Sequence, residues 1–283
     1  MFYSPLRYPG GKNKLAKFVA LVCKKNNING HYVEPYAGGA SVALHLLLNG
    51  YVKEITINDY DRAIYAFWHS ILYDTERFCR KIKNTEITLE NWKKFKAIHT
   101  NKEKTSLFNL GFATFFLNRT NHSGIIDGGM IGGLAQTGKY KIDCRFNKEE
   151  LTERIKFIAS AKDGIHLHHS DALKLIKKLQ KKDVTQNTIF YFDPPYYLKG
   201  PSLYMNHYKH EDHKKVSSEI RKMKNVRWIV SYDNVRAIRE LYRATKKQKY
   251  ILQHTAYEIK QGKEILFFSN NLLVPRIKNP VKV

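Results

Sequence analysis

The residue types best suited to chemistry follow one apolar segment, Phe190–Phe192. That segment runs into Asp193, Pro194, Pro195 and Tyr196, an acid followed by two prolines and an aromatic residue. Proline fixes φ and keeps the residue before it out of helical conformations, which predicts a rigid, extended loop. A loop of this kind can hold a weak nucleophile in line with a group donor, because orientation alone removes much of a reaction barrier.

The chemistry that fits this loop is methyl transfer to an amine. The Asp193 carboxylate and the Pro194 carbonyl can each accept a hydrogen bond from an exocyclic amine, direct its lone pair and stabilise the developing positive charge. Tyr196 can stack on the face of a base, which must leave a duplex to enter such a pocket. We therefore predict Asp193, Pro194, Pro195 and Tyr196 as catalytic residues. A strand that ends in a plain proline turn is the alternative.

A second group of residues has the spacing of a nucleotide site. Residues 33–41 indicate a strand, a turn at Gly38–Gly39 and a helix, which brings backbone N–H groups close to a cofactor, although a structural turn also fits. Asp59 follows the next predicted strand, roughly 20 residues later, where such folds place an acid on a ribose hydroxyl; a helix cap is the alternative. Asp171 follows a later strand and would either contact the cofactor adenine or cap the helix at Ala172.

The elements that must position these residues alternate along the chain. We expect a helix through residues 15–22 after the loop at Pro9–Gly11, and further helices at 40–48, 172–180 and 216–224. Strands are expected at 32–33, 54–58, 165–169, 188–192, 227–232 and 264–269. This alternation predicts an α/β fold with a parallel, doubly wound, Rossmann-like sheet. Residues 1–59 and 164–283 would form the catalytic domain, and 60–163 a mostly helical recognition insertion.

Composition limits the partners. The 283 residues hold 49 Lys and Arg against 25 Asp and Glu, a net charge of +24. A chain this basic usually meets a polyanion, although an AT-rich genome that favours lysine codons would produce a similar bias. The three cysteines suggest neither a disulfide framework nor a zinc site. We find no membrane-spanning run and no signal peptide, and expect a soluble, cytoplasmic protein.

Taken in order, four motifs resemble those of the Dam-type DNA adenine N6-methyltransferases, and the resemblance covers most of the chain. The motifs are Tyr8-Pro9-Gly10-Gly11-Lys12, Glu34–Ser41, Asp59 and Asp193–Tyr196. The resemblance implies S-adenosylmethionine as the methyl donor and double-stranded DNA as the partner, with no metal required. Together with the acids at the strand ends, it leads us to expect a cofactor site made of Tyr8, Lys12, Glu34, Pro35, Gly38, Asp59, Asp171 and Asp193.

The insertion also resembles the family, at residues 116–119 and Gly124. The family then continues with an Arg that helps to read GATC, whereas this chain continues Ile125-Ile126-Asp127, so the resemblance does not extend to the target sequence. The family's gap-filling Tyr aligns with His122. Donor side chains along residues 118–147 predict a DNA contact loop, against the alternative of a glycine-rich surface loop. The residues assigned to DNA are Asn118, Arg119, His122, Lys139 and Arg145, with Asn121 and Gln136 also suited to adenine edges.

These motifs predict a site-specific adenine methyltransferase that attacks the methyl donor directly with a flipped base. The alternatives are an RNA adenine methyltransferase, a DNA cytosine-N4 methyltransferase and a DNA-binding relative without activity. An NAD-dependent oxidoreductase is disfavoured by the glycine spacing. Residues 231–234 would line the target pocket or form a turn. A separate restriction endonuclease is compatible with this reading, and the family's habit favours a monomer.

Overall fold

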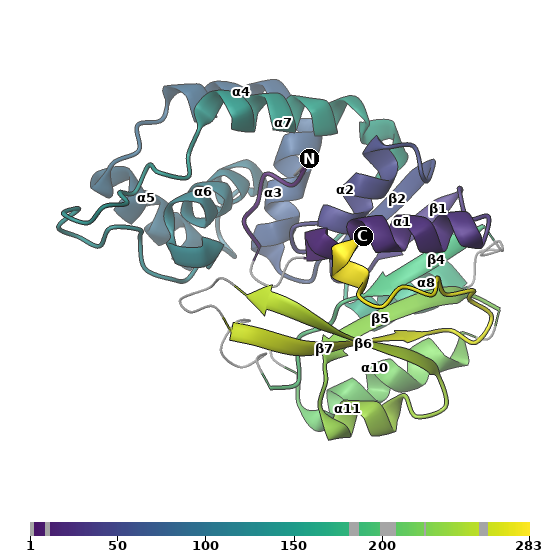
Figure 1. The fold of residues 1–283 in the computed structure, drawn as a ribbon. Coiled ribbons are helices and arrows are strands. Elements are labelled where there is room, and N and C mark those ends of the chain that lie inside the picture. The colour runs from purple at the N-terminus through teal and green to yellow at the C-terminus, as the bar shows by residue number, and fades with distance from the viewer. Residues whose placement is uncertain (1–2, 9–11, 181–186, 199–207, 224, 255–259) are drawn as a thin grey trace.

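A computed structural model describes residues 3–8, 12–180, 187–198, 208–223, 225–254 and 260–283. Its centre is a seven-stranded sheet in the order β3-β2-β1-β4-β5-β7-β6 (Figure 1). The strands are β1 His31–Glu34, β2 Glu54–Asn58, β3 Ile165–His168, β4 Thr188–Phe192, β5 Arg227–Asp233, β6 Lys246–His254 and β7 Lys260–Phe268. The order of the strands along the chain reverses between β1 and β4. The carboxyl ends of these two strands therefore border a crevice, which is where sheets of this kind bind ligands.

The prediction of a parallel sheet is right for five of the six predicted strands and wrong for β7. Strands β1 to β5 pair in parallel, whereas β7 pairs antiparallel with both β5 and β6. Strand β6 was not predicted at all. It forms the sheet edge and is rich in lysine, as edge strands often are, and Tyr250 is its one fully buried side chain within residues 246–251.

Helices cover both faces of the sheet, which confirms the doubly wound class. One face packs against α1 Ala16–Lys25, α2 Ser41–Leu48 and α3 Arg62–Tyr73. The other packs against α8 Ala172–Gln180, α10 His210–Lys222 and α11 Arg236–Leu241. Neighbouring residues of β4 alternate between the two cores, with Tyr191 in the first and Phe190 in the second, as the period of a strand requires.

Helices also fill the chain between β2 and β3. After α3 come α4 Thr75–Asn84, α5 Leu89–Thr100, α6 Leu107–Thr120 and α7 Lys148–Ser160 (Figure 1). Phenylalanines of α4, α5 and α6 form a continuous aromatic core, in which Phe78 contacts Phe112 and Phe115 with ring centroids 5.3 and 5.5 Å apart. The glycine-rich segment 121–147 joins α6 to α7 with little regular structure, apart from the short helix η2 His122–Gly124 and a bridge between Asn121 and Met130.

The predicted helices are present, with shifted ends. Helix α8 has the predicted bounds, whereas α10 begins at His210 rather than 216, because residues 210–215 are all polar or charged and carry no apolar period, although His213 is buried. The short helix η1 Lys12–Leu15 leads into α1. The loop predicted at Pro9–Gly11 lies outside the described residues. Within the described part of the chain, no helix is long and apolar enough to cross a membrane.

Candidate active site

A pocket of about 560 Å³ opens at the carboxyl ends of the parallel strands. It is bounded by the glycine turn after β1, by the residues after β2, β3 and β4, and by the start of α10. Most predicted cofactor residues lie in its wall: Tyr8, Glu34, Pro35, Gly38, Asp59, Asp171 and Asp193. Acids dominate its charged groups, and they are Glu34, Asp59, Asp61, Asp171, Asp193 and Asp212, against Lys209 and Lys215. In a chain of net charge +24, an acidic pocket fits a cationic ligand.

The glycine turn is tied to Asp59. Gly38 adopts φ of +46°, and its N–H donates to Asp59 Oδ2 over 2.9 Å. A Cβ at Gly38 would come within 2.6 Å of the Tyr8 ring, so glycine is required both for the backbone conformation and for this close approach. The cap of α3 is Asp61, which accepts from the Ala63 N–H, and not Asp59. Asp59 is therefore not a helix cap, and its side chain borders the pocket.

Burial and hydrogen bonds act in opposite directions on Asp59. Withdrawal from bulk water raises its pKa to about 6, although the backbone N–H groups of Asp61, Gly38 and Tyr60 lower it. A ligand that donates hydroxyl hydrogen bonds to Asp59 would favour the ionised form. A ribose is such a ligand, so the position fits the predicted role.

Asp171 caps a helix, which is one of the two roles that the sequence left open, and its contact with the cofactor adenine stays a prediction. Its Oδ1 accepts a hydrogen bond from the Lys174 N–H over 3.1 Å, which caps α8, and the residue also borders the pocket.

Asn58 holds this part of the site together. Its amide donates to the carbonyls of Pro35 and Ser170, and its carbonyl accepts from the Ser170 N–H, so one buried side chain links the ends of β1, β2 and β3.

Asp193 forms an ion pair with Lys12. Lys12 Nζ lies 3.1 Å from Asp193 Oδ2, and Ser231 donates to Oδ1 over 2.6 Å. Burial raises the pKa of Asp193, against the opposing effects of Lys12 and Ser231. A carboxylate has about four lone-pair positions, so two remain for a substrate amine. Lys12 is only 6% exposed and does not border the pocket itself, which places it behind Asp193.

Glu34 is a second buried acid near Asp193. It is 4% exposed, and its Oε2 atom has no hydrogen-bond partner among the described residues. Burial raises its pKa well above the ordinary value, and the charge of Asp193 raises it further. A buried polar atom without a partner is costly, and a ligand that binds in the pocket can satisfy it.

The rest of the predicted catalytic loop is less accessible than expected. Pro195 borders the pocket, and Pro194 is buried. Tyr196 is 8% exposed and does not border the pocket; Lys12 Nζ lies 4.8 Å from the centroid of its ring. The Asp233 carboxylate accepts from the N–H groups of Tyr197 and Leu198, so residues 231–233 hold the loop and do not border the described pocket.

A second, more open pocket of about 570 Å³ lies along the glycine-rich segment. Three of the residues predicted to bind DNA border it: His122, Lys139 and Arg145. All three are exposed, and Arg7, which sequence analysis had not selected, joins them there. We call this basic surface the Arg7–Arg145 groove. Arg7 and Tyr8 are adjacent in sequence, so one peptide unit borders both the groove and the acidic pocket.

Asn118 does not suit the predicted contact with DNA. It is fully buried, its Oδ1 accepts from the Arg7 N–H over 2.7 Å, and its amide donates to the carbonyls of Arg7 and Gly124. A Cβ at Gly124 would lie 1.9 Å from the Arg7 carbonyl oxygen, so glycine is needed for the approach. Arg119 is also largely withdrawn: its guanidinium donates to the carbonyls of Arg145 and Pro5. Both side chains support the groove from behind.

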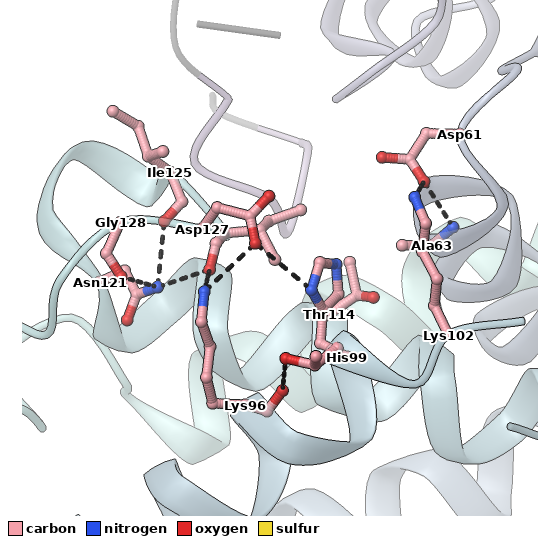
Figure 2. A network of polar contacts seen from close by, with 12 residues as sticks. Asp61, Ala63, Lys96, His99, Lys102, Thr114, Asn121, Ile125, Asp127 and Gly128 are labelled. Atoms are coloured by element: carbon pink, nitrogen blue, oxygen red, sulfur yellow. Dashed lines mark hydrogen bonds and ion pairs between the residues drawn. The ribbon is translucent and has the colours of Figure 1, made fainter. Parts of the chain in front are cut away.

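The other two amides assigned to adenine edges are also used internally. The Asn121 amide donates to the carbonyls of Ile125 and Gly128 (Figure 2) and to that of Ile126. Its own carbonyl accepts from Trp92 Nε1. Beside it, Asp127 pairs with Lys96 over 3.2 Å. Gln136 donates to two loop carbonyls and accepts from the Ile142 N–H. Since this segment lacks a strand ladder, side-chain amides satisfy its backbone.

Sequence analysis missed several residues that organise the site. Asn58 is a polar residue at the end of β2, directly before Asp59, and that position was a usable signal. Trp68 donates from Nε1 to the Gly38 carbonyl over 2.9 Å, from a helix far along the chain, and no local pattern could have indicated it. Glu264 was read only as the start of a strand, although it accepts from the Tyr196 hydroxyl.

Comparisons with known proteins agree with the site. The family model described as D12 class N6 adenine-specific DNA methyltransferase matches residues 8–259. In a search of curated proteins, no match is significant. Among solved structures, the rRNA methyltransferase aviRa from Streptomyces viridochromogenes matches with 10% identity and a TM-score of 0.37, covering 89% of this chain and 83% of that one. A likeness this weak carries no argument about the present chain.

The match over most of the sequence identifies the class of enzyme. The chain belongs to the D12 class of N6 adenine-specific DNA methyltransferases, with S-adenosylmethionine as methyl donor and DNA as substrate. The acidic pocket fits that donor, because a sulfonium and an amino group are cationic, Asp59 suits a ribose, and Glu34 offers an atom without a partner. This identification confirms the resemblance inferred from the four motifs.

Proposed function

We propose that this enzyme methylates N6 of an adenine that has left the DNA duplex, by direct attack of the amine on the methyl group. The observation that carries the proposal is that Asp193 and Pro195 border the same pocket as the glycine turn and Asp59. The methyl donor supplies an activated sulfonium carbon. The N6–carbon bond forms as the carbon–sulfur bond breaks, so no covalent enzyme intermediate is required.

Asp193 would act on the amine. It accepts a hydrogen bond from N6 with a lone pair that Lys12 and Ser231 leave available, and it stabilises the positive charge that develops on nitrogen. Its raised pKa favours acceptance of the proton that N6 must lose. Lys12 keeps the carboxylate oriented and compensates its charge before substrate arrives. Pro194 and Pro195 hold the backbone rigid, and the buried Tyr196 ring supports Lys12 behind Asp193.

The DNA would lie along the Arg7–Arg145 groove, with residues 60–163 as the recognition part. Exposed cations at Lys139 and Arg145, with the half-buried Arg7 beside them, suit phosphates or guanine edges, and glycines between them permit close approach of the backbone. The enzyme would act as a monomer, as the family's habit favours.

The test is product analysis. Purified protein is incubated with S-adenosylmethionine and unmethylated genomic DNA, and the digested DNA is analysed for methylated nucleosides by mass spectrometry. We expect N6-methyladenine from the parent and at least about a hundredfold lower turnover from Asp193→Ala, since one preorganised electrostatic contact is worth this much. The circular dichroism spectra of the two proteins should agree.

Two other outcomes are informative. N4-methylcytosine in place of N6-methyladenine would mean that the acceptor assignment is wrong. Near-parent turnover by Asp193→Ala would contradict the role of this carboxylate. Sequencing the methylated DNA of an active parent would then determine its target site.

A further inference from the structure

A carboxylate on a different strand faces the predicted catalytic loop. Glu264 lies on β7, opposite Asp233 at the carboxyl end of β5. It is therefore at the same end of the sheet as Asp193. It is 1% exposed. Burying a carboxylate costs free energy unless hydrogen bonds compensate it, so its partners identify what it holds.

Two of those partners are phenols. The Tyr196 hydroxyl donates to Glu264 Oε2 over 2.7 Å, and the Tyr250 hydroxyl donates to the same oxygen over 2.5 Å. Hydrogen bonds to an ionised acceptor are shorter and stronger than neutral ones. Since Tyr250 is on β6 and Tyr196 on the loop after β4, Glu264 fastens the catalytic loop to the antiparallel hairpin.

The fixed ring in turn contacts Lys12. The Lys12 ammonium lies 4.8 Å from the centroid of the Tyr196 ring and 3.1 Å from Asp193 Oδ2. A cation over an aromatic face is attracted to it, so the position of the ring affects the position of the ammonium. A contiguous series of contacts thus runs from Glu264 through Tyr196 and Lys12 to the reacting carboxylate.

We propose that Glu264 is a positioning residue for methyl transfer, which fixes the Tyr196 ring and thereby the Lys12–Asp193 pair. This inference rests on the proposed function, because it takes Asp193 as the residue that meets the adenine. Glu264 touches no reacting atom in this scheme. Its effect is on kcat, since small displacements of a reacting group lower the rate of the chemical step.

The experiment compares Glu264→Ala and Glu264→Gln with the parent enzyme. A glutamine oxygen can still accept from both phenols, whereas alanine removes both contacts. We expect Glu264→Ala to lower kcat by about tenfold to a hundredfold, with KM for S-adenosylmethionine changed less than about threefold, and Glu264→Gln to recover most of kcat. A purely structural role would not give this division between kcat and KM together with rescue by glutamine.

Tyr242→Phe is the matched control. Tyr242 is buried and packs on Phe267 of the same strand as Glu264, and its hydroxyl has no hydrogen-bond partner within the described chain. This variant should keep the parent's kcat. If Glu264→Ala fails to fold, Tyr196→Phe and Tyr250→Phe test the same contacts one at a time, and we expect Tyr196→Phe to show the larger loss of kcat.

The results separate the two proposals. If Asp193→Ala retains turnover, the proposed function fails. If Asp193→Ala is inactive while Glu264→Ala matches the parent's kcat, only the positioning role of Glu264 fails. Parent-like kcat in both Tyr196→Phe and Tyr250→Phe would also overturn that role. The double variant Glu264→Ala, Tyr196→Phe should lose no more kcat than Glu264→Ala alone, because both substitutions break the same contact between Tyr196 and Glu264. Losses of kcat that multiply would contradict the proposal.

Discussion

The acidic pocket and the glycine-rich segment 121–147 use polar side chains in opposite ways. In the pocket, Glu34, Asp59 and Asp193 border open space, while the sheet satisfies the backbone of the strands beneath them. In the glycine-rich segment, Asn121 and Gln136 turn inward and satisfy loop carbonyls. Where strands satisfy the backbone, polar side chains are therefore available to bind ligands. Where a segment lacks regular structure, its polar side chains are used to satisfy the backbone. The exposed cations of the Arg7–Arg145 groove remain available because buried amides hold the backbone behind them.

Among the substitutions that test this comparison, we expect the largest effect from a change at Asn118. Replacement by alanine leaves the buried N–H and carbonyl of Arg7 without their partner, so we expect about 2–4 kcal/mol of destabilisation, measured by urea unfolding. Asn109→Ala is the control on the same helix, since that residue is exposed, and it should change stability by less than about 0.5 kcal/mol. Unchanged stability in Asn118→Ala, combined with a loss of DNA affinity, would restore the direct role in DNA binding.

The next effect concerns Asp59 and pH. Its raised pKa of about 6 means that the native protein binds a proton more readily than the unfolded chain, so this group's contribution to stability falls as pH rises from 3.8 to about 6. Ribose hydroxyls donate to the ionised form, so affinity for S-adenosylmethionine should increase as pH rises through about 6. Asp59→Asn should weaken binding by roughly tenfold at pH 8, because hydrogen bonds to a charged group contribute about 1.5–3 kcal/mol.

Calorimetric titration at pH 5 and pH 8 tests this prediction. The change in affinity between the two conditions should be present in the parent and much smaller in Asp59→Asn. An identical pH dependence in both proteins would show that another group in the pocket is responsible.

The smallest effect is expected at an exposed cation of the groove. Lys139→Ala should weaken DNA binding by a few fold and reduce the slope of log affinity against log salt by roughly one, without a change in target sequence, as expected for a phosphate contact. Lys17→Ala, an exposed lysine of α1, is the control and should leave the slope unchanged. A change in sequence preference would instead make Lys139 a base-reading residue.

The contrast also explains which features the sequence could predict. Asp59, Asp171 and Asp193 could be located because each comes shortly after a predicted strand, and the carboxyl ends of parallel strands meet at one edge. The five parallel strands followed from the same periodicity. Strand β6 carries a lysine-rich pattern without an apolar run, so it escaped notice. The direction of an amide side chain in a loop depends on which backbone groups lack partners, and that is known only once the loop is folded.

The hydrogen bonds between Asn118 and the backbone of Arg7 affect how segments can be exchanged between related enzymes. Although residues 60–163 are contiguous in sequence, the backbone of Arg7 is held within them by Asn118 and Gly124. Arg154 of α7 likewise donates to the Ser4 carbonyl. A chimaera that receives a foreign segment 60–163 alone would leave these contacts unmatched. The stretch from Ser4 to Arg7 is held by that segment, so the two should be transplanted together if the proposed recognition role of the segment is to be moved intact.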